Sequence, residues 1–127
     1  MVLAMIGRIA AAADPGKFDG EFVDKNYLNG QAVFEFSVQQ SGNVLNIAFD
    51  TAYSDGHGAT PDATGVGKIS GNSALFDWKD SFGNTGTGVI TLADNGIVVS
   101  MRPIHVADPR CLVFYRENIK LSRIGKK

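Results

Sequence analysis

A chain of 127 residues with 44% hydrophobic and 20% charged side chains has the size and composition of a single soluble globular domain. Its formal net charge is −1, and its single cysteine, Cys111, excludes an internal disulfide framework. No apolar run approaches the roughly 18 residues that a membrane-spanning helix needs, which argues against membrane insertion of the folded domain.

The charges are unevenly distributed along the chain. Residues 1–109 carry twelve acidic and six basic side chains, whereas residues 110–127 carry six basic side chains and the single acid Glu117. No basic residue lies between Lys25 and Lys68, and a negative stretch repels phosphate, so we expect no nucleic-acid partner. The basic C-terminal stretch fits either a solvated strand edge and tail or a patch for an anionic surface, and its interleaved apolar residues favour the first.

Residues 1–13 are apolar and then small. The segment Ala11–Ala13 fits the small-residue cleavage site of an export signal, although Arg8 interrupts the apolar stretch. The alternative is a short N-terminal helix that stops before Pro15. We therefore predict a truncated export signal or short helix over residues 1–13, one β-barrel domain over residues 14–127, and a location outside the cytoplasm, periplasmic or secreted.

From Gly20 onward, apolar and polar residues alternate with a period of two, and turn residues separate the alternating runs. Such alternation is typical of a strand with one apolar face, and the Asn95-Gly96 pair tolerates the positive φ of a tight turn. The predicted strands are Glu21–Val23, Ala32–Gln39, Leu45–Tyr53, Val66–Ser70, Ala74–Lys79, Thr87–Ala93, Ile97–Pro103 and Cys111–Ser122.

About eight short strands in sequence-adjacent hairpins form a meander. An open sheet would leave its apolar face and both edges in water, so the strands must close on themselves or pack as two sheets, and closure fits best. We therefore predict an all-β fold, a single antiparallel up-and-down barrel. A barrel of about eight strands encloses enough space for side chains or for one small ligand. Bulky aromatic residues at the inward positions favour a packed core over a cavity. These residues are Phe34, Phe36, Phe49, Phe76, Trp78 and Phe114.

The size, the strand count, the hairpin order and the opening Gly20-Glu21-Phe22-Val23 resemble the calycin-like small barrels, the lipocalin and avidin group. They are also similar to the small periplasmic lysozyme-inhibitor barrels. The resemblance covers residues 20 to about 122 and is architectural, because Phe22 stands where the lipocalin opening Gly-x-Trp has tryptophan. It permits, without requiring, an inhibitor that inserts a loop into an enzyme cleft, and it assigns no ligand residue.

The most unusual segment is the connection from Tyr53 to Gly65. Hairpin loops usually have about two to five residues, and loops of about twelve or more are often functional. Tyr53, Asp55, His57 and Asp62 are suited to hydrogen bonding a partner or to insertion into a partner's cleft. The alternative is a mobile polar connection in which glycines only relieve strain. The spacing matches neither a zinc pattern nor a calcium loop, so we predict no metal and no cofactor.

A second candidate is the proline-bounded connection Arg102–Cys111. Arg110 is suited to binding a carboxylate, and His105 to titrating near neutral pH. The alternative is that Asp108 and an arginine form a surface pair and His105 is solvated. Cys111 beside Arg110 suggests a nucleophile, since a nearby cation lowers a thiol pKa, but a small buried residue is the favoured interpretation.

The glycines at positions 83, 86 and 88 resemble a phosphate-binding loop only superficially, because neither a Lys-Ser/Thr pair nor a helix follows them. We interpret them as a hairpin turn and as positions where the strands coil tightly. Asp77 and Asp80 are candidates for a carboxylate pair, but Lys79 between them favours a surface charge pattern.

These observations predict a non-enzymatic extracytoplasmic binding module that uses end loops to contact a protein or a small ligand. The predicted contact residues are Tyr53, Asp55, His57 and Asp62, with His105 and Arg110 as a second set. Two alternatives stay open. One is a small enzyme that uses a histidine with a nearby aspartate, and the other is a purely structural or assembly module with an exposed apolar patch.

Overall fold

The computed structural model describes residues 17–125. The predicted signal or helix over residues 1–13 therefore lies outside the described residues. The elements in chain order are β2 (Gly20–Tyr27), β3 (Ala32–Ser41), β4 (Val44–Tyr53), β5 (Asp62–Ser70), β6 (Ser73–Asp80), β7 (Thr85–Ala93), β8 (Gly96–His105), the 3-10 helix η1 (Pro109–Phe114) and β9 (Ile119–Gly125). Among the described residues, no helix is long enough and apolar enough to span a membrane.

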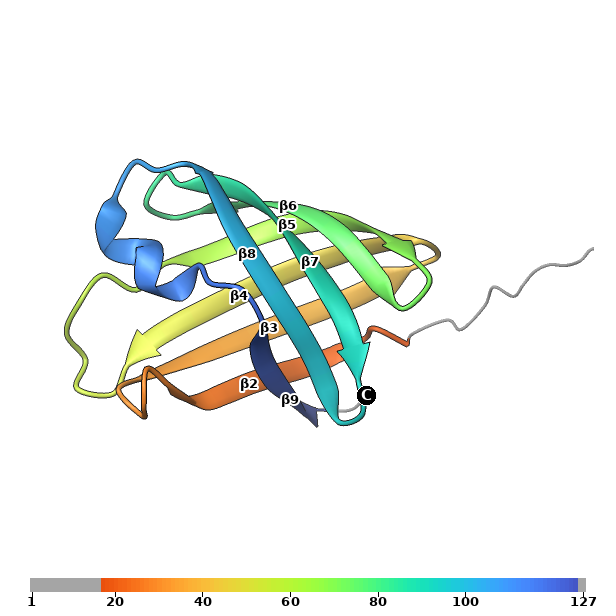
Figure 1. The fold of residues 1–127 in the computed structure, drawn as a ribbon, viewed down its shortest axis with the longest axis horizontal. Helices are drawn as coiled ribbons and strands as arrows, with labels where there is room; N and C mark the ends of the chain where they lie inside the picture. Colours follow the sequence, from red (N-terminus) through yellow and green to blue (C-terminus); the bar gives the residue numbers. More distant parts are fainter. Residues whose placement is uncertain (1–16, 126–127) are drawn as a thin grey trace, which may run out of the picture.

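The strands form one closed barrel in sequence order, from β2 to β9, and every neighbouring pair is antiparallel (Figure 1). The prediction of an all-β up-and-down barrel is confirmed. The period-two pattern explains it, because each strand alternates between buried and exposed residues and so has one face for a common core. This architecture is compatible with a calycin-like fold.

Several predicted boundaries are wrong. The first strand, predicted over Glu21–Val23, continues as β2 to Tyr27. Two other differences bear on the loop end.

β5 begins at Asp62 and not at Val66, so the long connection covers only residues 54–61. The glycines at 65 and 67 do not end this strand, because they pair with Trp78 and Phe76 on β6 and lie close to the backbone of that strand. A Cβ at Gly65 would overlap the Asp77 carbonyl oxygen, and a Cβ at Gly67 would lie 2.9 Å from the Leu75 carbonyl oxygen.

The last predicted strand, Cys111–Ser122, is the second of these differences. Residues 109–114 form η1, and the strand begins only at Ile119. Pro109 fixes its own φ at the start of the turn, and the side chain of Asp108 accepts a hydrogen bond from the Arg110 backbone N–H. Cys111 and Phe114 are both buried, at the three-residue spacing of a 3-10 helix.

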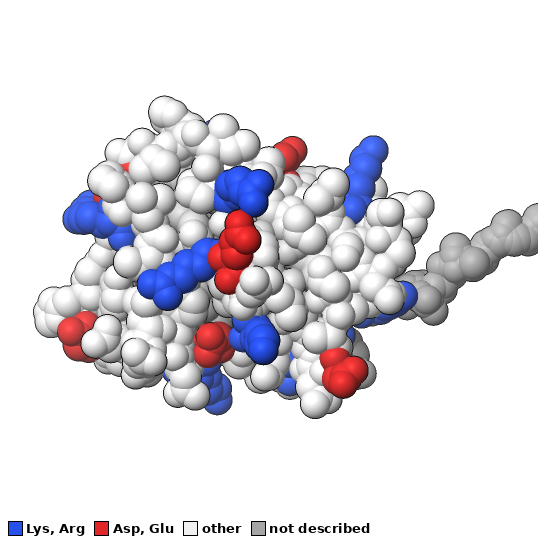
Figure 2. Space-filling view, viewed as in Figure 1, with Lys and Arg blue, Asp and Glu red and all other residues white. Residues whose placement is uncertain are grey.

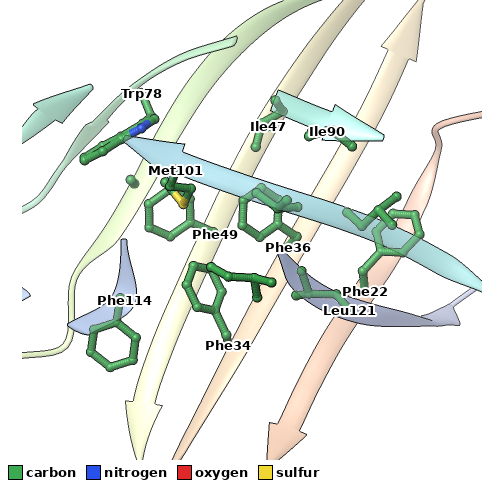
Figure 3. Packing of buried hydrophobic residues seen from close by; sticks show 14 of the residues in the cluster. Phe22, Phe34, Phe36, Ile47, Phe49, Trp78, Ile90, Met101, Phe114 and Leu121 are labelled. Atoms are coloured by element: carbon green, nitrogen blue, oxygen red, sulfur yellow. The ribbon is translucent and has the colours of Figure 1, made fainter. Parts of the chain in front are cut away.

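Aromatic rings fill the barrel interior (Figure 3). Phe49 lies near the centre, with its ring centroid 5.3 Å from that of Phe36 and 5.5 Å from that of Phe34. Phe114, which is fully buried, covers one end of this core, and Phe18, which is 1% exposed, covers the other end. The interior is therefore packed with side chains, as the aromatic residues at inward positions led us to expect.

The two ends of the barrel are built differently (Figure 1). At one end, which we call the turn end, three tight turns join β3 to β4, β5 to β6 and β7 to β8. At the other end, which we call the loop end, lie four connections, residues 28–31, 54–61, 81–84 and 106–118. We call residues 106–118, which contain η1, the cap.

Candidate functional site: the loop end

The structure places all six predicted contact residues at the loop end. Tyr53 ends β4, Asp62 begins β5, and His105 ends β8. Asp55 and His57 lie in the connection between β4 and β5, and Arg110 lies in η1. In an antiparallel up-and-down barrel, every second connection lies at the same end. This topology by itself brings the two predicted sets of contact residues to the loop end.

The connection 54–61 is anchored at both ends and at one internal residue. The Ser54 hydroxyl donates to the carbonyl oxygen of Gly30 at 2.9 Å, and the Thr51 hydroxyl donates to the carbonyl oxygen of Pro61 at 2.8 Å. Ala59 is 8% exposed and belongs to the core cluster. These contacts hold the connection against the barrel and leave only its middle exposed.

Tyr53 contributes to this anchoring. Its ring packs edge-on against Phe114 of the cap, with centroids 5.6 Å apart, and the backbone at Gly58 lies directly against the same ring. A Cβ at Gly58 would overlap the tyrosine ring, and φ there is +120°. The connection therefore folds over Tyr53, and this residue supports the exposed surface from below.

His57 and Asp55 form the exposed part of the connection. Their side chains are 89% and 76% exposed, and Nδ1 of His57 lies 4.0 Å from Oδ1 of Asp55. The same carboxylate oxygen accepts the His57 backbone N–H at 2.9 Å. An exposed pair of this kind adds little stability because water screens it. The arrangement is thus a polar tip on an anchored loop, on open surface.

Asp62 does not join this pair in a common site. It pairs with Asp50 across β4 and β5 on the outer face, and its backbone N–H donates to the Ser81 hydroxyl at 3.2 Å. Within residues 17–125, no group of three His, Cys, Asp or Glu side chains is placed to hold a metal ion. The loop-end residues therefore offer hydrogen bonds and charge to a partner.

On the cap, Arg110 binds Asp108 through two nitrogens, with Nη2 2.7 Å from Oδ2 and Nε 3.0 Å from Oδ1. The hydrogen bonds from Arg110 lower the pKa of the Asp108 carboxyl. The guanidinium also lies 5.9 Å from the ring centroid of Phe82 in the neighbouring turn. His105 is exposed at the end of β8, opposite Thr85. The predicted surface pair and solvated histidine are both confirmed.

Three exposed apolar side chains accompany these charges, and the sequence analysis did not identify them. Ile104 is 70% exposed, Val106 42% and Leu112 38%. The pairing of β7 with β8 shifts by one residue between Thr85 and Gly86, which leaves Ile104 without a partner. Such a β-bulge redirects a side chain, and no local pattern in the sequence marks its position.

Beneath the cap lies a buried polar cluster of Asp80, Asn84 and Tyr115. The Asp80 carboxylate accepts hydrogen bonds from Asn84 Nδ2 at 2.8 Å, from the Asn84 backbone N–H at 2.8 Å and from the Tyr115 hydroxyl. Burial and the neighbouring carboxylate raise the pKa of Tyr115. Asp77 points outward and Asp80 inward, so the two do not form a carboxylate pair, and the surface charge pattern holds for Asp77 and Lys79 but not for Asp80.

Cys111 is fully buried beside this cluster. Burial, followed by the nearby carboxylates of Asp80 and Asp108, raises the pKa of its thiol to about 11. A thiol needs a lowered pKa and access to solvent to act as a nucleophile. The nucleophile interpretation is therefore wrong, and the interpretation as a small buried residue is confirmed.

Comparisons with known proteins give no family for this chain. A scan against protein-family models, a search of curated proteins and a search of solved structures each found no match. The functional argument therefore stands on the geometry of the loop end.

Proposed function

We propose that this protein is a non-enzymatic binding module that holds a protein partner with its loop end. The observation that carries the proposal is the composition of the surface formed by the end of β8 and the cap, which Asn84 holds through hydrogen bonds to the backbone N–H groups of Ala107 and Asp108. Ile104, Val106 and Leu112 expose apolar surface beside the charged pair of Arg110 and Asp108. Protein interfaces combine an apolar centre with arginine and a polar rim, and rigid loops lower the entropy lost on binding.

A small ligand inside the barrel is a weaker proposal. The interior is occupied by aromatic side chains, with Phe114 and Phe18 covering its two ends. A carrier needs an enclosed space for its ligand, as larger or emptier barrels provide. The packed interior supports contact on the outer surface of the loop end.

An enzyme that uses a histidine with an aspartate has less support from the geometry. That hypothesis expects a histidine and a carboxylate in a concave pocket. His57 meets Asp55 on open surface, and His105 is exposed at a strand end. The exposed positions of both histidines favour roles in contacting a partner.

The architecture also supports two finer proposals. A barrel of this strand order fits a calycin-like protein of the lipocalin and avidin type or of the periplasmic lysozyme-inhibitor type. In the second type, the connection 54–61 would enter the cleft of a secreted hydrolase, with His57 and Asp55 at its tip. A site of action outside the cytoplasm rests on the sequence of residues 1–13, and we keep it as a proposal.

The test is capture of a partner from the secreted fraction of an expressing cell, with matched surface variants. Ile104→Ser combined with Leu112→Ser, which we call the cap variant, removes apolar surface from the end of β8 and from the cap. Ile124→Ser removes a comparably exposed side chain, 58% exposed, on β9. A partner that binds the wild type and I124S but not the cap variant supports the proposal. The proposal fails if no partner is retained, or if the cap variant retains it fully.

A second measurement tests the inhibitor proposal. The purified protein is assayed against secreted hydrolases, lysozymes included, up to high micromolar concentration. Inhibition that His57→Ala weakens supports insertion of the connection 54–61 into an enzyme cleft. Absence of inhibition across the panel removes the inhibitor version and leaves the general binding module to the capture experiment.

A structural or assembly module is the second candidate function, and one observation favours it. Val66 and Leu75 on the outer face of β5 and β6 are 56% and 67% exposed, and both line a groove on that face. Exposed apolar surface on a strand face is typical of association. Light scattering decides between the candidates. An oligomer that Leu75→Ser dissociates supports assembly, and a monomer at all concentrations contradicts it.

A further inference from the structure

The barrel has a seam where β9 is too short to reach both neighbours along their length. β9 pairs with β8 only from Gly96 to Val99, and with β2 only from Glu21 to Val23. Beyond these points β2 and β8 continue toward the loop end, and the last residues of the cap run between them (Figure 1). There the Met101 backbone N–H donates to the Arg116 carbonyl oxygen at 2.8 Å.

A cleft of about 510 Å³ opens at this seam, and we call it the seam cleft. Most of the side chains that line it are exposed, so the seam cleft is open to solvent. One wall is the connection after β2 and the other is the end of the cap. None of the six contact residues predicted from the sequence lines it. The seam cleft is therefore separate from the apolar surface that the proposed function uses.

Four side-chain amides line the seam cleft, from Asn26, Asn29, Gln31 and Asn118. Within residues 17–125, no protein group hydrogen-bonds to these side-chain amides. Each amide carries both donors and an acceptor. Sugar hydroxyl groups are donors and acceptors at once, so a row of amides matches their hydrogen-bonding capacity.

The backbone of both walls is held in an uncommon conformation. In the described part of the chain, the non-glycine residues with positive φ are Leu28 at +55°, Asn29 at +59° and Asn118 at +60°. All three line the seam cleft. Leucine is rarely found there, and such outliers cluster at ligand sites. Leu28 packs against the core, and the Ser54 hydroxyl holds the Gly30 carbonyl oxygen, which fixes this wall.

Two cations of the cleft are available to pair with an anion. Arg116 and Lys120 line it, and none of the carboxylates in residues 17–125 forms an ion pair with either. Its two acids, Asp24 and Glu117, already accept bonds from the Asn26 backbone N–H and from Arg102.

Basic and acidic side chains alternate across this face of the molecule and do not gather into a patch of one sign (Figure 2). The two cations and two carboxylates that line the cleft sum to no formal charge, so the cleft has no net positive potential to attract a doubly charged phosphate, and a carboxylate would be held by direct contact with the two cations. The guanidinium of Arg116, 5.8 Å from the ring centroid of Tyr27, is the group suited to a planar carboxylate.

We propose that the seam cleft binds a sugar that carries a carboxylate, with Arg116 and Lys120 holding the carboxylate and the amides of Asn29 and Asn118 holding hydroxyl groups. This site does not depend on the protein partner of the proposed function. It gives the basic C-terminal stretch a role beyond a solvated strand edge.

The experiment is a titration followed by two-dimensional NMR of ¹⁵N-labelled protein, with glucuronate as the probe. Glucose, acetate and inorganic phosphate are titrated in parallel. We expect saturable shifts of the Asn29 and Asn118 backbone amides with glucuronate at about 1–10 mM, and at least about tenfold weaker binding of glucose and acetate.

Two variants, each at an exposed residue, complete the experiment. Arg116→Gln should weaken glucuronate binding by about tenfold, whereas Lys68→Gln, which removes one positive charge outside the cleft, should leave it unchanged. Unperturbed spectra outside the cleft show that both variants fold.

The proposal is overturned if glucuronate gives no saturable shift at the cleft, if acetate binds as well as glucuronate, or if phosphate binds more tightly. It is also overturned if K68Q and R116Q weaken binding equally. None of these results affects the outcome of the capture experiment with the cap variant. Failure of the seam-cleft proposal can therefore be distinguished from failure of the proposed function.

Discussion

Glycine and aromatic side chains are matched in size across neighbouring strands of the barrel. Gly86 and Gly88 on β7 pair with Trp78 and Phe76 on β6, and all four positions face inward. The indole N–H of Trp78 donates to the Thr87 carbonyl oxygen at 2.9 Å, so the ring lies across β7. These glycines make room for the rings, which explains them without a phosphate ligand.

Gly88→Ala should destabilise the barrel. A Cβ there would lie 2.6 Å from Cε1 of Phe76 and 2.8 Å from the Ser100 carbonyl oxygen. We expect the free energy of unfolding in urea to fall by about 2 kcal/mol, the usual cost of overpacking. Thr87→Ala, at the outward neighbour, should cost less than about 1 kcal/mol. Equal effects of the two changes would contradict this account of the glycine.

The raised thiol pKa of Cys111 predicts a loss of stability at alkaline pH. The unfolded thiol ionises near its ordinary value of 9.0, and the folded thiol keeps its proton up to about pH 11. Between these values the unfolded state loses a proton that the folded state retains, so stability falls as pH rises. Two pKa units correspond to roughly 2–3 kcal/mol.

The measurement for Cys111 is urea unfolding from pH 8 to pH 11 in the wild type and in Cys111→Ala. The variant should lose a smaller part of its stability over this range. A residual slope is expected from two buried tyrosines, because burial raises the pKa of Tyr27 to about 12 and also raises the pKa of Tyr115. Identical slopes in the two proteins would show that the thiol does not titrate as argued.

The cap is an irregular element that the barrel holds through Asn84. The side-chain oxygen of Asn84 accepts the backbone N–H groups of Ala107 at 2.7 Å and of Asp108 at 2.9 Å. Its Nδ2 donates to Asp80, which also accepts the hydroxyl of Tyr115. One buried amide thus joins β6, the turn 81–84 and the cap, and it fixes the surface that we propose for the partner.

Asn84→Ala should release the cap more than it disturbs the sheet. The change leaves two backbone N–H groups without an acceptor and the Asp80 carboxylate with one donor fewer. We expect the free energy of unfolding to fall by about 3 kcal/mol. Hydrogen exchange of the Ala107 and Asp108 amides should accelerate most. Asn46→Ala, at an exposed position on β4, should change stability by less than about 0.5 kcal/mol. Unchanged exchange at the cap in N84A would contradict the role of Asn84.

The molecule is a barrel with a packed interior and two different ends. The aromatic core occupies the interior, the turn end is covered by Phe18, and the loop end carries the cap and the anchored connection 54–61. At the turn end, the Phe18 backbone N–H donates to the side chain of Gln40 at 3.0 Å.

A filled interior predicts that the wild type binds no apolar guest inside the barrel. Phe49→Ala should create a cavity among Phe34, Phe36 and Trp78, lower stability by about 3–5 kcal/mol, and allow benzene or xenon to bind. NMR shifts of core methyl groups report the binding. Should F49A fail to fold, Phe49→Leu gives a smaller cavity for the same measurement. Shifts of equal size in the wild type would show that the interior is open.

The sequence alone determined the strands, their order and the closed barrel, because alternation and turn residues are local signals and each hairpin pairs neighbours in the chain. It also placed Asp55, His57, His105 and Arg110 at one end, since antiparallel topology leaves no other arrangement. The pairing of Arg110 with Asp108 and the burial of Cys111 followed from adjacent residues.

Packing decided the rest. An apolar run such as Cys111–Phe114 fits a strand or a helical turn equally well. Pro109, the hydrogen bond that the Asp108 side chain accepts from the Arg110 backbone N–H, and the burial of Cys111 and Phe114 together select the turn. The inward direction of Asp80, the exposure of Ile104 at a bulge and the convergence of Asn29 with Arg116 each depend on contacts between segments far apart in the chain. Local sequence patterns do not predict such contacts, so only the tertiary structure reveals the cap surface and the seam cleft.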